Sequence, residues 1–149
     1  MQIEPFGAKM IELLPKLMRE VTQHEHNYLS RGKITLPQLW VLECLSRRKE
    51  SSPMNLLAES LRISRPAATG LVDRLIAQGL VRREGDPKDR RVVRITITPK
   101  GQKTIDNIWE QKRRTIVRAF GQISPSDRAQ YITILKKVVD NLTQSQAKP

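Results

Sequence analysis

The change from helical to strand-like periodicity at Gly79 constrains the fold more than any other feature of the sequence. Apolar residues in 64–78 recur every three or four positions, as on one face of an amphipathic helix. Gly79 followed by Leu80 is typical of a Schellman helix end, in which the glycine takes a left-handed conformation. Residues 80–83 then form a short extended stretch, and residues 92–98 alternate apolar and polar side chains. The segment therefore predicts a helix that leads into a two-stranded hairpin.

Helical patterns surround this segment on both sides. The sequence predicts further helices at residues 6–28, 36–48, 53–61, 99–120 and 125–144. The helices at 53, 99 and 125 begin with a proline that follows Ser52, Thr98 and Ser124, which are good N-cap residues. Pro15 lies inside the first helix, where we expect a kink.

The order of these elements predicts a mainly α fold with a small β-wing. Residues 36–98 are expected to form a winged helix-turn-helix DNA-binding domain, and residues 1–35 and 99–145 a helical dimerisation region. The terminal helices carry apolar stripes that one small chain cannot cover alone, so we expect a homodimer. Residues 146–149 are predicted to be a disordered tail.

The charge of the chain favours an anionic partner. Its formal net charge is +12, which makes nucleic acid or an anionic membrane a natural partner, although a merely basic surface is the alternative. No apolar stretch reaches the length of about 20 residues that a membrane span needs. The chain has one cysteine and no basic, then apolar, leader at its N-terminus, so a cytoplasmic location without a membrane partner is expected.

Two surfaces of the predicted domain have the chemistry of DNA contacts. The face of 64–78 opposite the apolar stripe carries small residues flanked by arginines, which suits close approach to a major groove. The wing, 82–94, has six basic side chains against three acidic ones, which suits a minor groove. In each case the alternative is an ordinary solvated surface. The residues expected to contact DNA are Ser64, Arg65, Pro66, Thr69, Gly70, Asp73, Arg74, Arg83, Lys88, Asp89, Arg90 and Arg91.

Several stretches resemble the MarR (multiple-antibiotic-resistance regulator) family. Residues 57–75 and 79–83 are similar to its helix-turn-helix, whereas 86–91 and 98–101 are similar to its wing and the exit from the wing. The resemblance implies a homodimer joined by the terminal helices, which binds a double-stranded, pseudo-palindromic operator. It also implies that a small aromatic or phenolic effector often relieves repression. Arg91 occupies the family's Asp-x-Arg position, with Asp89 available to hold a neighbouring arginine.

Two features of this chain depart from the family pattern. Pro15 interrupts a helix that usually runs straight, which affects the dimer geometry. Cys44 is not at the position of the family's peroxide-sensing cysteine, which argues against a peroxide sensor. A repressor is the leading prediction, and a ligand-independent nucleic-acid-binding winged helix is the alternative.

An effector pocket is predicted between the first helix and the winged domain. Its candidate lining residues are Leu17, His24, Trp40 and Cys44. Trp40 can line this pocket or fill the core, and a buried, inert cysteine is the default for Cys44.

The sequence predicts neither a cofactor nor a metal site. His24 and His26 are two residues apart and therefore point to different sides of a helix, which makes a poor chelate. The sequence also lacks a nucleophile–base pair, a carboxylate cleft and a phosphate-binding glycine loop, so an enzyme is not expected.

Overall fold

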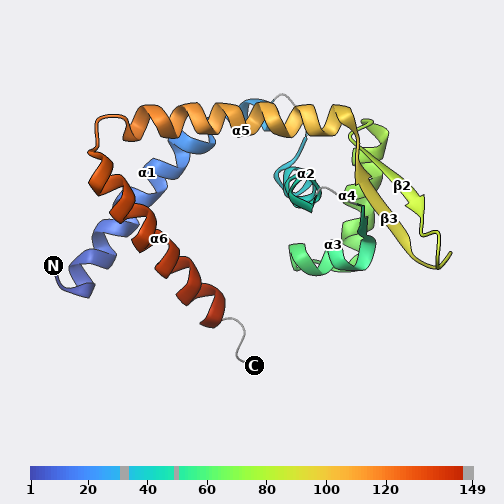
Figure 1. Ribbon diagram of the computed structural model, residues 1–149, viewed down its shortest axis with the longest axis horizontal. Helices are drawn as coiled ribbons and strands as arrows, with labels where there is room; N and C mark the ends of the chain where they lie inside the picture. Colours follow the sequence, from blue (N-terminus) through green and yellow to red (C-terminus); the bar gives the residue numbers. More distant parts are fainter. Residues whose placement is uncertain (31–33, 49–50, 146–149) are drawn as a thin grey trace. The chain divides into compact units, whose positions relative to one another are not determined.

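The computed structural model describes the backbone of residues 1–30, 34–48 and 51–145, and the side chains of 1–22, 34–48 and 51–144. The chain forms two compact units, residues 1–112 and 113–149, which divide within one long helix. The predicted tail at 146–149 lies outside the described residues. The elements are α1 (Ile3–Ser30), α2 (Leu36–Arg48), β1 (Ser52–Pro53), α3 (Met54–Leu61), α4 (Arg65–Ala77), β2 (Val81–Gly85), β3 (Val93–Ile97), α5 (Pro99–Phe120) and α6 (Pro125–Ser145) (Figure 1).

The fold is mainly helical with one small antiparallel sheet, as the sequence predicts. The strand order is β1-β3-β2, so β3 lies in the centre. The β2–β3 ladder runs from Val81 opposite Ile97 to Gly85 opposite Val93. This hairpin is the predicted wing, and it follows α4 directly (Figure 1).

Strand β1 is an element that the sequence analysis missed. We expected Ser52 to cap a helix beginning at Pro53, but Ser52 pairs with Ile95 of β3 and α3 begins at Met54. The prediction was wrong because a two-residue strand has no alternation to read, and its partner lies far along the chain. The strand brings the start of the helix-turn-helix against the wing.

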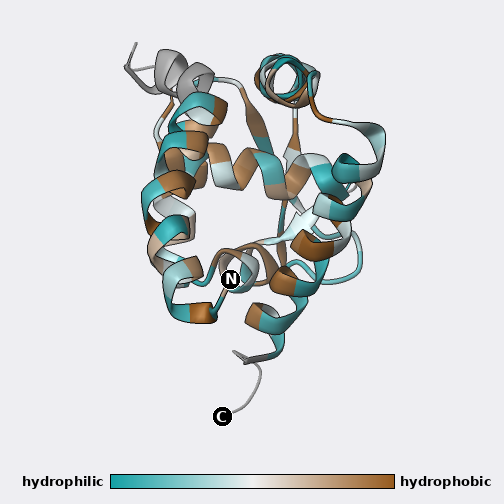
Figure 2. Cartoon of the chain, turned by 90° about the vertical axis from the view of Figure 1, so that its left-hand side faces the viewer, coloured by the Kyte–Doolittle hydropathy of each residue, from teal (hydrophilic) through white to brown (hydrophobic). Residues whose placement is uncertain are grey.

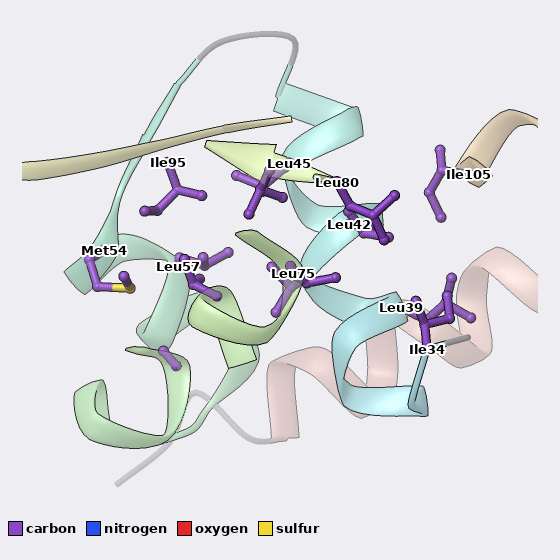
Figure 3. Close-up of a cluster of buried hydrophobic side chains, with 14 of the residues drawn as sticks. Ile34, Leu39, Leu42, Leu45, Met54, Leu57, Leu75, Leu80, Ile95 and Ile105 are labelled. Atoms are coloured by element: carbon purple, nitrogen blue, oxygen red, sulfur yellow. The ribbon is translucent and has the colours of Figure 1, made fainter. Parts of the chain in front are cut away.

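The core of the first unit lies between the three short helices and the sheet. Leu45 of α2, Leu57 of α3, Leu75 of α4 and Ile95 of β3 are fully buried together (Figure 3). Ile105 of α5 belongs to the same cluster. Burial of each such side chain is worth roughly 1.5–3 kcal/mol, so this apolar cluster is the main favourable term that holds α4 in place.

Local signals set both ends of α4. The Ser64 hydroxyl accepts a hydrogen bond from the Ala67 N–H at 3.2 Å and caps the start of α4. At its end the Gly79 N–H donates to the Ile76 carbonyl and the Leu80 N–H to the Leu75 carbonyl. These two bonds, with Gly79 at φ 71°, make the predicted Schellman motif.

Side-chain caps also begin the neighbouring helices. Thr98 Oγ1 accepts from the Gly101 N–H at 3.1 Å, and Ser124 Oγ accepts from the Asp127 N–H at 3.1 Å, as expected for the starts of α5 and α6. Helix α2 begins with a capping box that the sequence analysis did not identify. The Thr35 N–H donates to Gln38 Oε1 at 2.7 Å, which satisfies one N–H that the helix leaves open.

The terminal helices keep apolar side chains at the surface. Helix α1 is continuous through Pro15 and exposes apolar side chains that include Phe6, Met10, Leu13 and Leu14. In the second unit, α6 likewise exposes Ile132, Leu135, Val138, Val139 and Leu142. Figure 2 shows brown, hydrophobic segments along the helix that ends at the C-terminus. Among the described residues, no helix combines the length and apolar character needed to cross a membrane.

Candidate nucleic-acid interface

Helix α4 has one buried and one exposed face, as its sequence predicts. Ala68, Val72 and Leu75 are fully buried, and Leu71 packs against the same core at intermediate burial. The opposite side carries Arg65, Pro66, Asp73 and Arg74, which are exposed, together with Thr69 and Gly70, which are half-buried. The predicted contact residues of this helix therefore share a surface that a DNA groove can reach.

Backbone contacts already use the two hydroxyl groups on this surface. Ser64 Oγ accepts the cap hydrogen bond described above, and Thr69 Oγ1 donates to the Arg65 carbonyl at 2.9 Å. A hydroxyl that donates within the helix can still accept a hydrogen bond. The side chains of Ser64 and Thr69 are short, and Arg65 is the longest side chain of the first turn of α4.

Three arginines of the wing are paired with carboxylates of the protein itself. Arg83 Nη2 lies 2.7 Å from Asp73 Oδ1, which joins the base of β2 to α4. Arg82 Nε lies 2.6 Å from Glu84 Oε1, and Arg94 Nη1 lies 3.2 Å from an oxygen of Asp86. Arg83 and Asp73, both predicted to contact DNA, are thus partners of each other.

Two aspartates shape the tip of the wing. Asp86 Oδ1 accepts from the backbone N–H groups of Lys88 and Asp89 at 2.8 and 3.2 Å. Asp89 Oδ1 accepts from the Arg91 N–H at 2.9 Å. We expected Asp89 to hold an arginine side chain, but its carboxylate bonds the backbone and Asp86 takes the arginine, Arg94. The reason is the tight turn, whose N–H groups lie closer to Asp89 than a guanidinium does.

The pKa of Asp86 reflects these contacts. The hydrogen bond from the Lys88 N–H holds the pKa of this carboxyl below its usual range, with further help from Asp89 and Arg94, while desolvation opposes the shift. Asp86 is therefore ionised near neutral pH and keeps its role in the turn.

The remaining basic residues of α4 and of the wing carry positive charges that no carboxylate of the described chain pairs with. Within the part of the chain that the structure describes, these side chains make no ion pair, and all of them are exposed. They are Arg65 and Arg74 of α4, and Lys88, Arg90 and Arg91 of the wing tip. We call this set the free cations.

One cavity brings a member of each element together. A cavity of about 150 Å³ is lined by Arg65 from α4, Arg91 from the wing and the first residues of α3, Met54 and Asn55, with Val92 and Val93 beside them. Two arginines therefore line a shared space, although they are far apart in the sequence. This arrangement raises the local positive potential where an anionic backbone can approach.

The residues predicted to line an effector pocket are only partly described. Leu17 and Cys44 are half-buried, and the side chain of His24 lies outside the described residues. Trp40 is 47% exposed, so the alternative that it fills the core is wrong for this chain by itself. A cavity of about 600 Å³ lies elsewhere, between the start of α2 and the end of α4, with Gln38 and Arg74 among its lining residues.

Sequence and structure comparisons show that the chain is similar to proteins of a known family. The family model described as MarR family matches residues 33–92. The HTH-type transcriptional regulator YkoM of Bacillus subtilis, itself called uncharacterized, is 29% identical over 88% of this chain and 84% of its own length. The HTH-type transcriptional repressor NicR of Pseudomonas putida is 26% identical over 87% and 84% of the two chains.

A solved structure agrees with these matches over nearly the whole chain. The structure of a MarR family protein from Bacillus stearothermophilus has a TM-score of 0.78 and 25% identity, and covers 96% of this chain and 99% of that one. The relatives are regulators rather than enzymes. The chain is accordingly similar, in sequence and in its winged helix-turn-helix fold, to DNA-binding transcription regulators of the MarR family.

Proposed function

We propose that the protein is a sequence-specific repressor that binds a pseudo-palindromic operator as a homodimer. The observation that carries the proposal is that free cations of α4 and of the wing tip lie together, since Arg65 and Arg91 line one cavity. Helix α4 has the dimensions to enter a major groove, and a basic ribbon tip suits the adjacent minor groove. The two elements together can read one half-site.

The exposed apolar side chains of the terminal helices support the homodimer. Residues 1–35 and 99–145 are proposed to form the dimerisation region, because α1 and α6 leave most of their large apolar side chains in water. A two-fold dimer presents two copies of α4, and half-sites about 10 base pairs apart follow from that symmetry.

The repressor role is proposed from a relative, and the effector from the surroundings of Trp40. NicR, a relative, is named a transcriptional repressor. Leu17, His24, Trp40 and Cys44 are proposed to contact a small aromatic or phenolic effector that releases DNA. The exposed indole of Trp40 supports this assignment, since it offers an aromatic surface without a complete protein cover. A regulator of this kind acts where chromosomal DNA is, in the cytoplasm.

Selection of binding sites from random duplex DNA tests the proposal. We expect a pseudo-palindromic consensus, and loss of binding when an effective aromatic acid is added. Tryptophan fluorescence would report the acid, with a Trp40→Phe variant to separate its signal from that of Trp109. A selected pool without any palindrome would favour the ligand-independent nucleic-acid-binding alternative.

Salt dependence provides a second, independent measurement. A dimer that contacts about 6–10 phosphates loses roughly 10³–10⁵ in affinity between 50 and 200 mM salt, because bound phosphates release counterions. An affinity that barely changes over this range would mean that the free cations do not bind a phosphate backbone.

A further inference from the structure

The guanidinium of Arg94 joins two segments that are far apart in the chain. Its Nε donates to Ser51 Oγ at 2.6 Å, and its Nη2 donates to the Ser51 carbonyl oxygen at 2.8 Å. Its Nη1 donates to Asp86 Oδ2 at 3.2 Å. The side chains of Arg94 and Asp86 are only 27% and 17% exposed, so this ion pair is partly shielded from water. A planar guanidinium that bonds in three directions fixes its acceptors relative to one another.

The two residues that accept these hydrogen bonds, Ser51 and Asp86, belong to the helix-turn-helix side and the wing side of the domain. Ser51 directly precedes β1, and β1 leads into α3, the first helix of the helix-turn-helix. Asp86 follows β2, and its other oxygen holds the backbone of Lys88 and Asp89 in the tip turn. Arg94 therefore connects the turn that carries the wing's free cations to the start of the helix-turn-helix.

The wing requires such a connection because one of its strands has little apolar packing. Val81, at the inner end of β2, is buried, whereas the residues that follow it on this strand are exposed. The ladder ends at Gly85 opposite Val93, before the tip begins. Strand β3 is held by its pairing with β1 and by the burial of Ile95, whereas the outer part of β2 and the tip have no such support. Segments with few apolar contacts open easily, and the contacts of Arg94 tie this end of the hairpin down.

We propose that Arg94 is a positioning residue for DNA binding, which holds the wing tip at a fixed place relative to the helix-turn-helix. The inference rests on the proposed function, because the position matters only when tip and α4 engage one duplex together. Without the connection the tip keeps its charge but samples many positions. Ordering it on DNA then costs conformational entropy, so binding to a defined site weakens. Non-specific attraction depends on charge and falls only by the one charge removed.

The test compares Arg94→Ala with Arg82→Ala in the full chain. Both variants remove one positive charge from the wing, but Arg82 pairs with Glu84 on its own strand and its side chain is 58% exposed. Affinity is measured for a duplex selected by the wild-type protein and for a scrambled duplex. We expect Arg94→Ala to weaken the selected duplex about tenfold, similar to the loss of a groove contact, and Arg82→Ala less than about threefold. On the scrambled duplex the two variants are expected to agree.

Arg94→Lys separates the geometry of the guanidinium from its charge. Lysine keeps the charge but lacks the planar fork, so this variant is expected to bind the selected duplex nearly as weakly as Arg94→Ala. Hydrogen exchange gives a readout that does not involve DNA. The Asp86 N–H donates to the Val92 carbonyl at 3.0 Å, and its exchange is expected to quicken in both Arg94 variants but not in Arg82→Ala.

The outcomes distinguish this inference from the proposed function. Equal losses for Arg94→Ala and Arg82→Ala on the selected duplex, or full recovery in Arg94→Lys, overturn the positioning role. If the Arg94 variants do not fold, Ser51→Ala decides, because it leaves every charge in place and removes one acceptor; an unchanged affinity then overturns the role. A wild-type protein that selects no sequence contradicts the proposed function instead. In that case unchanged Asp86 exchange in the Arg94 variants overturns the connection.

Discussion

At the scale of single residues, basic side chains in the winged domain divide by what they contact. Arg82, Arg83 and Arg94 each lie against a carboxylate, so much of their charge is offset within the protein. The free cations have no such partner in the described chain and keep their full attraction for an anion. We therefore expect the positions of the free cations, rather than the net charge of +12, to decide where DNA binds.

Substitution of two free cations separates shape reading from base reading. Arg91→Ala is expected to weaken binding most on operators with A·T-rich flanks, by about 1–3 kcal/mol, because narrow minor grooves attract arginine. Arg65→Ala is expected to relax preference at one or two base pairs. Competition binding on operators that differ only in their flanks measures both effects. An equal loss for Arg91→Ala on A·T and G·C flanks would make the wing a phosphate clamp.

The lowered pKa of Asp86 sets the pH range of the wing turn. Because the folded pKa lies below the unfolded one, the stabilisation is complete above the unfolded pKa and is lost as pH falls through the folded value. We therefore expect the turn to stay intact between pH 7 and pH 5, and to loosen only in stronger acid. Carboxyl NMR of Asp86 measures the midpoint, with an unfolded peptide of the same segment as the control. A midpoint above that of the peptide would contradict the expectation.

At the scale of elements, the sequence predicts helix ends and caps, which depend on neighbouring residues, better than it predicts contacts between distant residues. The bounds of α2 were predicted to the residue, and the Schellman end at Gly79 was found, because both depend on neighbouring residues. The capping box Thr35–Gln38 was readable from its spacing but was overlooked. The pairing of β1 with β3 and the hydrogen bonds between Arg94 and Ser51 join residues about 43 positions apart in the sequence, and no local pattern predicts such a pairing.

Two glycines give opposite predictions for the same substitution. A Cβ at Gly101 would lie 2.0 Å from the Leu80 carbonyl oxygen, so Gly101→Ala must displace backbone and is expected to destabilise the domain by about 1–3 kcal/mol. Gly70 has nothing within 4 Å of such a Cβ and lies inside α4, so Gly70→Ala should stabilise by about 0.5–1 kcal/mol.

DNA binding adds a second readout to the glycine pair. The new methyl group of Gly70→Ala lies on the DNA-facing surface and is expected to lower operator affinity while thermal stability rises. Chemical denaturation and operator titration of both variants measure the two effects. Unchanged affinity in the stabilised Gly70→Ala protein would show that DNA does not approach this part of α4 closely.

At the scale of the whole molecule, the exposed apolar side chains predict an assembly. Leu135 and Val139 are 43% and 49% exposed on α6, so replacing both with glutamate is expected to break the homodimer and lower stability, since folding and association are linked. Light scattering and thermal unfolding measure the two effects, with Lys136→Glu as a control on the same helix. A wild-type protein that remains a folded monomer at micromolar concentration would refute the homodimer.

The sequence predicted the winged domain more fully than its surroundings for a physical reason. The domain buries its core against elements of the same chain, including Ile105 of α5, so its periodicity has a partner in the same chain. The apolar stripes of α1 and α6 stay exposed in the single chain, so the elements that would cover them are not in it. Periodicity shows that such a stripe must be covered, but not which copy or element covers it.

The construction of the wing tip has a consequence for how regulators of this kind diverge. Asp86 and Asp89 make the turn through backbone N–H groups, so the turn does not depend on the side chains at positions 88, 90 and 91. Those side chains can be exchanged without cost to the scaffold. Because these side chains are proposed to contact DNA, we expect that a lineage can change its operator preference by a few point mutations at the tip, and that a designer can make the same short exchange.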